Sequence, residues 1–344
     1  MTSIKDVARL ASVSVSTVSR VLRGSGSVDE DTRRRIEQTM EAINYRPNLL
    51  AQGLRSKSGL VIGLVVPERP HETFASFVMH TERACATLGY NLVVGNTTGQ
   101  PDAEATFVDS LLRRHVDGIV FSRVSDRSQV LNVIRKWKTP AVTIDRALDQ
   151  EEVPTIVLDN FRAGQIAANY LISLGHARFG IVTGPQDIAI SRERLKGFSS
   201  VVEQHGLTLL ARDVVEGDFG YDSGEEAGRA LVGRGLTAVW CENDLMAVGA
   251  MNAFRKEGLR VPDDVSVMGM DNANLSRMTL PALTTVSQPF EEMCWKAVEL
   301  IVAMRSGEPL GERRFVLQPE LVIRDSACEA TAKGRAVRRG LGSQ

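Results

Sequence analysis

The chain has 344 residues, of which 43% are hydrophobic and 24% are charged, a composition typical of folded globular proteins with two or three domains. It contains no apolar run of about 18 residues and no signal segment, so we expect neither a membrane span nor export. The four cysteines are widely spaced and form no metal-binding pair, which favours reduced thiols and a cytoplasmic location.

The net charge of −1 conceals an uneven distribution. Residues 1–58 carry ten Lys or Arg against six Asp or Glu, whereas the remaining residues carry 31 against 36. A basic N-terminal part on a mildly acidic body suits a protein that binds a polyanion at one end.

Residues 4–23 have the pattern of two short helices joined by a tight turn. Apolar residues recur at helical spacing in the first segment, and Ser3 with Asp6 forms a loose capping box before it. The outer face of the second segment carries short, hydrogen-bonding or basic side chains: Val15, Ser16, Thr17, Ser19 and Arg20. Such a face can approach base edges, and Arg can bind guanine with two hydrogen bonds. The pattern predicts a DNA-reading helix-turn-helix; an ordinary amphipathic helix pair is the alternative.

A third helix is expected to begin at Asp29, and Pro47 follows its end. Residues 48–55 then predict a helix of about two turns, which is marginal in water by itself and weakened by Gly53. Either this segment packs on the body as a linker helix, or it folds only when paired with its copy on DNA. In the second case a leucine could pry open a base step in the minor groove.

From Gly59 onward, short β-rich runs alternate with helical patterns, which indicates parallel sheets covered by helices. The expected strands are 60–66, 91–94, 118–121, 141–144, 155–158, 179–182, 214–215, 238–240 and 265–270, with a late run at 316–323. The expected helices are 75–88, 103–115, 161–174, 192–205, 222–234, 244–257 and 290–306. About nine strand–helix units are too many for one compact sheet, so we expect two lobes. The basic tail from about residue 328 has little to bury and is expected to be disordered.

Four segments carry a family resemblance: IKDVARLA at 4–11, VSVSTVSRVL at 13–22, NYRPN at 44–48 and AQGL at 51–54. They resemble the lactose-repressor/galactose-repressor (LacI/GalR) family of bacterial transcription regulators, and the resemblance runs almost to Ile323. It implies an N-terminal all-α helix-turn-helix domain (1–46), followed by a hinge helix and linker (47–58). It further implies an α/β periplasmic-binding-protein-like core of two doubly wound parallel-sheet lobes for effector binding and dimerisation (59–327), before the basic tail (328–344).

The resemblance also implies partners and DNA contacts. The family works as homodimers on near-palindromic operators, so we expect a homodimer on double-stranded DNA, associated with the nucleoid, without a cofactor or metal. Val15, Ser16 and Arg20 match base-reading positions, and Leu54 matches the hinge leucine that wedges into the operator. The expected DNA-binding residues are Val15, Ser16, Thr17, Arg20, Asn48, Ala51 and Leu54.

Effector candidates follow from the strand pattern, because ligands of open α/β sheets bind beyond the carboxyl ends of the strands. The candidates are Phe74, Asp145, Arg146, Arg192, Phe219, Asn243, Asp271 and Gln288. Their planar polar groups can pair with vicinal hydroxyls, and the Phe rings suit the C–H surface of a sugar. This set resembles that of the family's sugar-binding relatives and implies a pentose- or hexose-type effector. Strand-end acids such as Asp244 can instead cap the next helix.

Three other readings compete with a sugar-responsive repressor. A co-repressor-type regulator of a nucleoside or purine is one alternative, although such an effector would favour extra aromatic stacking, and Glu72 and Thr73 precede Phe74 where the common pattern has a second Phe. An enzyme is not expected, since the sequence holds no G-x-G-x-x-G, P-loop, H-E-x-x-H or G-x-S-x-G motif. The basic N-terminal module speaks against a plain sugar-binding protein.

Overall fold

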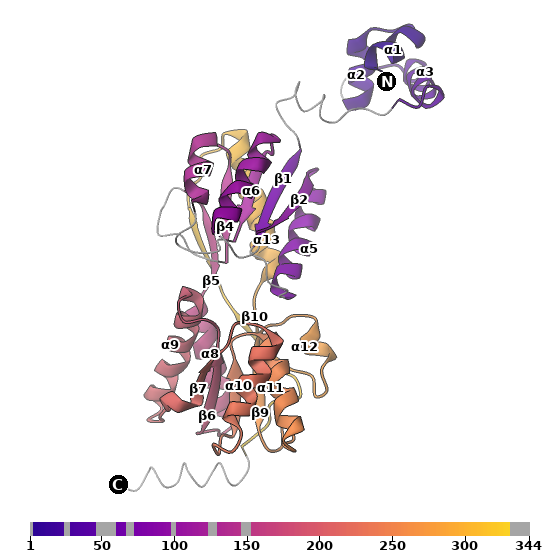
Figure 1. The fold of residues 1–344 in the computed structure, drawn as a ribbon. Coiled ribbons are helices and arrows are strands. Elements are labelled where there is room, and N and C mark those ends of the chain that lie inside the picture. Colours follow the sequence, from indigo (N-terminus) through magenta and orange to yellow (C-terminus); the bar gives the residue numbers. More distant parts are fainter. Residues whose placement is uncertain are drawn as a thin grey trace. The chain divides into compact units, whose positions relative to one another are not determined.

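A computed structural model of the chain describes residues 3–23, 28–45, 60–66, 72–97, 101–122, 129–145 and 153–330. The chain divides into two compact units, Met1–Leu60 and Val61–Gln344 (Figure 1). Each unit has its own hydrophobic core. The predicted hinge at 47–58 lies outside the described residues.

The N-terminal unit consists of helices α1 (Ile4–Leu10), α2 (Val15–Arg23) and α3 (Glu30–Ala42). Ser3 caps α1 in a reciprocal capping box, in which the Ser3 amide donates to Asp6 Oδ2 at 3.0 Å. Ser14 accepts from the Thr17 amide at 3.1 Å where α2 begins, and Asp29 caps α3. Apolar side chains of all three helices form the core: Val7, Ala8, Ala11, Val18, Val21 and Ile36. The predicted all-α helix-turn-helix domain is confirmed.

The second unit contains two six-stranded sheets, one in each of two lobes. The first-lobe sheet has the order β11-β5-β4-β3-β1-β2, with β1 Val61–Val66, β2 Asn91–Asn96, β3 Gly118–Phe121, β4 Ala141–Ile144, β5 Thr155–Leu158 and β11 Arg314–Leu317. The second-lobe sheet has the order β12-β10-β9-β8-β6-β7, with β6 Phe179–Thr183, β7 Val214–Glu216, β8 Ala238–Cys241, β9 Ser266–Asp271, β10 Thr284–Ser287 and β12 Glu320–Val322. All neighbouring strands are parallel except β10 and β12.

Helices cover both faces of each sheet (Figure 1). In the first lobe they are α5 (Glu72–Thr87) and α13 (Phe290–Ser306) on one face, and α6 (Pro101–Arg113) and α7 (Val130–Trp137) on the other. In the second lobe they are α8 (Asn160–Ser173) and α9 (Ala189–Gln204) on one face, and α10 (Tyr221–Leu231) and α11 (Asp244–Lys256) on the other, with the short η1 (Ala211–Asp213) and α12 (Leu275–Met278) beside them. The predicted core of two doubly wound parallel-sheet lobes is confirmed.

The structure differs from the predicted elements in the late run and in elements that were not predicted, among them the short η1 and α12. The late run at 316–323 is not one strand but two, β11 and β12, which belong to different sheets. Pro319 lies between them, and a proline cannot donate a ladder hydrogen bond. Strand β10 and helix α7 were not predicted, because the threonines and serine of β10 give it no apolar run.

Helices α10 and α11 approach each other backbone to backbone. A Cβ built on Gly249 would lie 2.2 Å from the carbonyl oxygen of Tyr221, and one built on Gly224 would lie 2.3 Å from that of Met246. Only glycine allows so close an approach. The pair therefore packs as one rigid layer.

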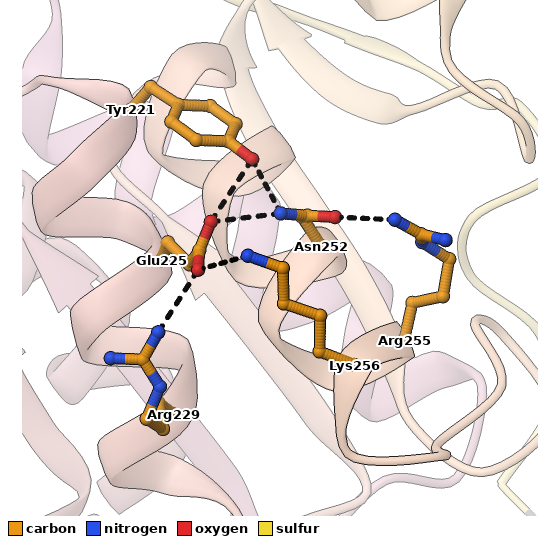
Figure 2. A network of polar contacts seen from close by, with 6 residues as sticks. All are labelled: Tyr221, Glu225, Arg229, Asn252, Arg255 and Lys256. Atoms are coloured by element: carbon orange, nitrogen blue, oxygen red, sulfur yellow. Dashed lines mark hydrogen bonds and ion pairs between the residues drawn. The ribbon is translucent and has the colours of Figure 1, made fainter.

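A polar network centred on Glu225 joins the same two helices (Figure 2). The Glu225 carboxylate accepts hydrogen bonds from Lys256 Nζ at 2.6 Å, Asn252 Nδ2 at 2.8 Å, Arg229 Nη2 at 3.0 Å and Tyr221 Oη at 3.2 Å. These contacts, led by the Lys256 hydrogen bond, lower the pKa of Glu225 to about 2. The network fixes α10 against α11 on the outer side of the second lobe.

The start of the predicted tail packs on the second lobe. The carbonyl oxygen of Cys328 pairs with Nε2 of the buried His176 at 3.0 Å, and the Ala330 amide donates to the Leu174 carbonyl at 2.8 Å. Burial lowers the pKa of His176. Residues 331–344 lie outside the described part of the chain.

Among the helices of the described ranges, none is long and apolar enough to cross a membrane.

The close approach of α10 and α11 predicts a stability effect at Gly249. Gly249→Ala should lower the free energy of unfolding by about 1–3 kcal/mol, because its Cβ meets a backbone oxygen that cannot rotate away. Urea denaturation followed by circular dichroism measures the change. Gly311→Ala is the matched control, since nothing lies within 4 Å of its Cβ. Similar losses in both variants would contradict the packing argument.

Candidate functional site

The outer face of α2 presents the predicted base-reading side chains. Ser16 and Arg20 are exposed, whereas Val15 and Thr17 are half-buried and Val15 packs on the core of the unit. The Ser14 hydroxyl lies 2.6 Å from that of Ser16 and 2.8 Å from that of Thr17. Small side chains and one extended cation on an exposed helix face suit a major groove. The other three predicted DNA contacts, Asn48, Ala51 and Leu54, lie outside the described residues.

A second cluster is centred on Asp271, the last residue of β9, which is 4% exposed. Gln288 Nε2 donates to Asp271 Oδ1, and Thr73 Oγ1 donates to Asp271 Oδ2 at 2.9 Å. Thr73 belongs to α5 of the first lobe, so this hydrogen bond joins the two lobes. Burial raises the pKa of Asp271 to about 6, although the charge of Arg194 opposes the increase.

Asp145, at the end of a first-lobe strand, lies near enough to Asp271 for their charges to interact. It directly follows β4, is 8% exposed, and its negative charge also contributes to the raised pKa of Asp271. Phe74 follows Thr73 in α5 and is half-buried, with its ring centroid 6.4 Å from that of Phe77. The structure therefore gathers Asp145, Asp271 and Gln288 from the predicted set, while Arg146 lies outside the described residues.

Asn243 and Phe219 are engaged with each other. Asn243 caps α11, with Oδ1 accepting from the Met246 amide at 2.9 Å and Nδ2 donating to the Phe219 carbonyl at 2.8 Å. Phe219 has a left-handed backbone, with φ at 69°, and its ring lies against Gly184, where a Cβ would meet Cζ at 2.1 Å. These two predicted residues thus shape the loops that precede α10 and α11.

The structure corrects the expectation that Asp244 caps a helix, since Asn243 fills that role. The buried Asp244 carboxylate instead accepts from the Ala273 amide at 2.8 Å and from Thr285 Oγ1 at 2.6 Å. It therefore ties the start of α11 to the segments that follow β9.

Arg192, a predicted effector contact, and Arg194 have different environments in α9. Arg192 is exposed and donates to the Gln186 carbonyl at 2.8 Å. Arg194 is 2% exposed and donates to Asn160 Oδ1 at 2.8 Å and to the Glu242 carbonyl at 2.7 Å. Helical spacing gave a usable signal, because Arg194 shares a face with Gly197, which packs on α8.

Several buried polar atoms near strand ends have no hydrogen-bond partner among the described residues. They are Ser122 Oγ after β3, Thr183 Oγ1 at the end of β6 and Gln288 Oε1 after β10. Buried polar groups are nearly always paired, so a concentration of unpaired ones calls for a ligand or water. Of these, only Gln288 was predicted from the sequence.

Glu242 is a buried acid of the second lobe, and its carboxyl group is hydrogen-bonded to the side chain of Ser191 in α9. Its Oε2 accepts from the Gly184 amide at 2.8 Å. Burial raises its pKa to about 8, against the opposing effects of Arg194 and of the Gly184 hydrogen bond. At neutral pH the side chain is therefore largely protonated and can donate a hydrogen bond as well as accept one.

Over the described ranges, no group of three or more His, Cys, Asp or Glu side chains is arranged to hold a metal ion.

Family models match parts of both units. Residues 3–48 match the model of bacterial regulatory proteins of the lacI family, and residues 168–327 match a periplasmic binding protein-like domain. The chain is 32% identical over 329 residues to the HTH-type transcriptional regulator DegA of Bacillus subtilis (strain 168), covering 94% of this chain and 98% of that protein.

Solved structures of transcriptional regulators share the fold. A complex of the transcriptional regulator CelR with cellobiose has 30% identity and a TM-score of 0.72, covering 95% of this chain and 100% of that one. The lac repressor dimer bound to operator and the anti-inducer ONPF has 28% identity and a TM-score of 0.84, covering 95% and 99%. These similar proteins are regulators rather than enzymes.

The raised pKa of Glu242 predicts a pH-dependent effect of Glu242→Gln. An acid whose pKa is higher in the folded state than its usual 4.5 loses stability as the pH rises from 4.5 through about 8. The amide has no such loss, so the variant should become the more stable protein by roughly 2–5 kcal/mol above pH 8. Melting temperatures of both proteins between pH 5 and 9 test this. Parallel curves would show that folding does not raise the pKa of Glu242.

Proposed function

Since the chain belongs to the lacI family of bacterial regulatory proteins, we propose that it is a transcriptional repressor that binds a palindromic operator as a homodimer. A small sugar-like effector of the pentose or hexose type, bound in a cleft between the lobes, controls its DNA affinity. It acts in the cytoplasm, associated with the nucleoid when bound to DNA.

The observation that carries the effector proposal is the inter-lobe contact at Asp271. Thr73 of the first lobe and Gln288 both donate to this carboxylate, and Gln288 Oε1 has no partner among the described residues. Sugar hydroxyls donate and accept hydrogen bonds, so they can satisfy Asp145, Asp271 and Gln288 together. A ligand held there contacts both lobes, which is the requirement for a change in their relative angle.

The polar character of this cluster favours a sugar over the alternative effector. A nucleoside or purine co-repressor would profit from a second aromatic ring beside Phe74, but that position holds Thr73, whose hydroxyl binds Asp271. A similar regulator has been solved as a complex with cellobiose. Of the remaining predicted contacts, Phe74 and Phe219 would offer faces to the sugar, and Arg146, Arg192 and Asn243 would line the same cleft.

Exposed apolar side chains support a homodimer. Met278 and Leu280 are 80% and 98% exposed, and Val93 and Val94 are exposed on the edge strand β2. Exposed apolar patches and free sheet edges are surfaces that a partner commonly covers, and the similar lac repressor structure is a dimer. The tail sequence lacks a leucine heptad, which favours dimers over tail-bundled tetramers.

In the proposed mechanism, effector binding changes the angle between the lobes of each subunit. This moves the two hinge segments of a dimer apart, and the weak helices at 47–58 unfold. The hinge side chains then leave the minor groove: Leu54, Asn48 and Ala51. The two reading helices of the dimer can no longer bind both half-sites of the major groove through Val15, Ser16, Thr17 and Arg20. The coupling required is about 1–3 kcal/mol, which is usual for allosteric proteins.

An effector titration tests this function. Thermal shift with a panel of pentoses, hexoses, nucleosides and purines identifies the ligand, because binding raises the melting temperature. We expect a pentose or hexose to bind and to weaken operator affinity by about 5- to 150-fold, and Asp271→Asn to lose the shift. Binding of a nucleoside or purine that strengthens DNA binding would favour the alternative. A sugar that binds without changing DNA affinity would refute the coupling.

The base-reading role of α2 predicts a specific effect at Arg20. Arg20→Ala should relax base preference at one operator position by roughly 1–3 kcal/mol, because a forked contact to guanine is lost. Affinities for single-base operator variants measure this preference. Arg9→Ala removes another exposed arginine, on α1, and should change affinity equally for all variants. A uniform loss in Arg20→Ala would assign Arg20 to phosphate contact instead.

A further inference from the structure

Helix α13 reaches from the proposed effector site to the amino ends of the strands in the first-lobe sheet. It begins at Phe290, whose amide donates to the Gln288 carbonyl at 2.9 Å, and Gln288 binds Asp271. Its 17 residues span about 25 Å. Most of one side is buried in the first-lobe core: Phe290, Met293, Cys294, Ala297, Val298, Leu300 and Ile301. The helix is therefore a rigid element with one end at the effector site.

The other end of α13 meets the residues that hold the start of β1. Arg305, in the last turn of α13, forms an ion pair with Asp117 Oδ1. Asp117 is 2% exposed, and its Oδ2 accepts from the Val61 amide at 3.1 Å. The Asp117 amide in turn donates to the Val61 carbonyl at 2.7 Å. Asp117 therefore holds both backbone groups of Val61, the first residue of the second unit.

A second contact ties α13 to the same place. A Cβ built on Gly118 would lie 2.2 Å from Cγ2 of Ile301, so the helix lies directly on the backbone of the residue after Asp117. Because Gly118 has no side chain that could move, a small displacement of the helix there acts directly on the backbone of β3. The burial of Asp117 also makes its charge costly without a cation beside it.

We infer that Arg305 and Asp117 are positioning residues that couple α13 to Val61, so that a change at Gln288 alters how firmly the chain is held where it enters the core. The regulatory meaning of this coupling rests on the proposed function, because Val61 follows the residues that connect the core to the DNA-binding unit. The path from Gln288 through α13 to Arg305, Asp117 and Val61 consists of contacts within the second unit.

Hydrogen exchange of the full chain, followed by mass spectrometry without DNA or effector, tests the inference. The variants are Gln288→Ala, Arg305→Gln and their combination, and the readout is the segment 60–66. Arg305→Gln should raise its exchange rate by about tenfold or more, because a charge-assisted contact to the buried Asp117 is lost. Gln288→Ala should raise it in the wild-type background and add nothing when Arg305 is already replaced.

Two controls separate this effect from general loosening. Arg83→Gln breaks an exposed ion pair with Glu291 near the beginning of α13 and should leave segment 60–66 unchanged. Exchange of β6 in the second lobe should also stay constant. Arg305→Lys, which keeps the charge without the forked geometry, gives the same comparison if Arg305→Gln does not fold.

The inference is overturned if Gln288→Ala leaves segment 60–66 unchanged, or if it adds the same factor with and without Arg305. Because the test uses neither DNA nor effector, such a failure leaves the proposed repressor function untouched. Conversely, a failed sugar titration would leave this coupling standing as a mechanical property of the core.

Discussion

The buried carboxylate of Asp271 is stabilised from two lobes at once, and the behaviour of the core depends on this shared contact. Burial makes the charged form costly, as its raised pKa shows, so hydrogen bonds from Thr73 and Gln288 are needed to hold it. One of these donors lies in the opposite lobe. A ligand that offers Asp271 a hydroxyl therefore competes with a contact between the lobes, which makes occupancy of the site and lobe geometry parts of one equilibrium.

Such an equilibrium requires lobes that do not deform internally. In the second lobe, a Cβ on Gly164 would lie 2.0 Å from the Arg194 carbonyl oxygen and one on Gly197 would lie 1.9 Å from that of Phe161. This contact of α8 with α9 fixes the backbone that carries Arg194. The Glu225 network does the same for α10 and α11 (Figure 2). Close packing of this kind leaves relative motion of the lobes as the soft coordinate.

The sequence predicted the architecture better than the site. Short apolar runs located most of the strands to within two residues, because buried parallel strands are nearly continuous in apolar residues. The strand-end positions of Asp271 and Gln288 could also be read from the chain. The buried contacts of Thr73, Arg194 and Glu242 could not, because they involve neighbours distant in sequence: Thr73 meets Asp271 only after the lobes assemble, and Arg194 differs from Arg192 only by its helix face.

The parallel topology explains why the proposed effector site and the entry of the chain into the core lie far apart. In a parallel sheet the carboxyl ends of all strands point the same way. Asp145, after β4, therefore lies at the opposite end of the strands from Val61, at the amino end of β1. A signal from the site must therefore cross the length of the strands. Helix α13 packs on the first-lobe sheet through side chains, its first residue contacts Gln288, and Arg305 in its last turn contacts Asp117 just before β3. Helix α13 is therefore the element that joins the two ends.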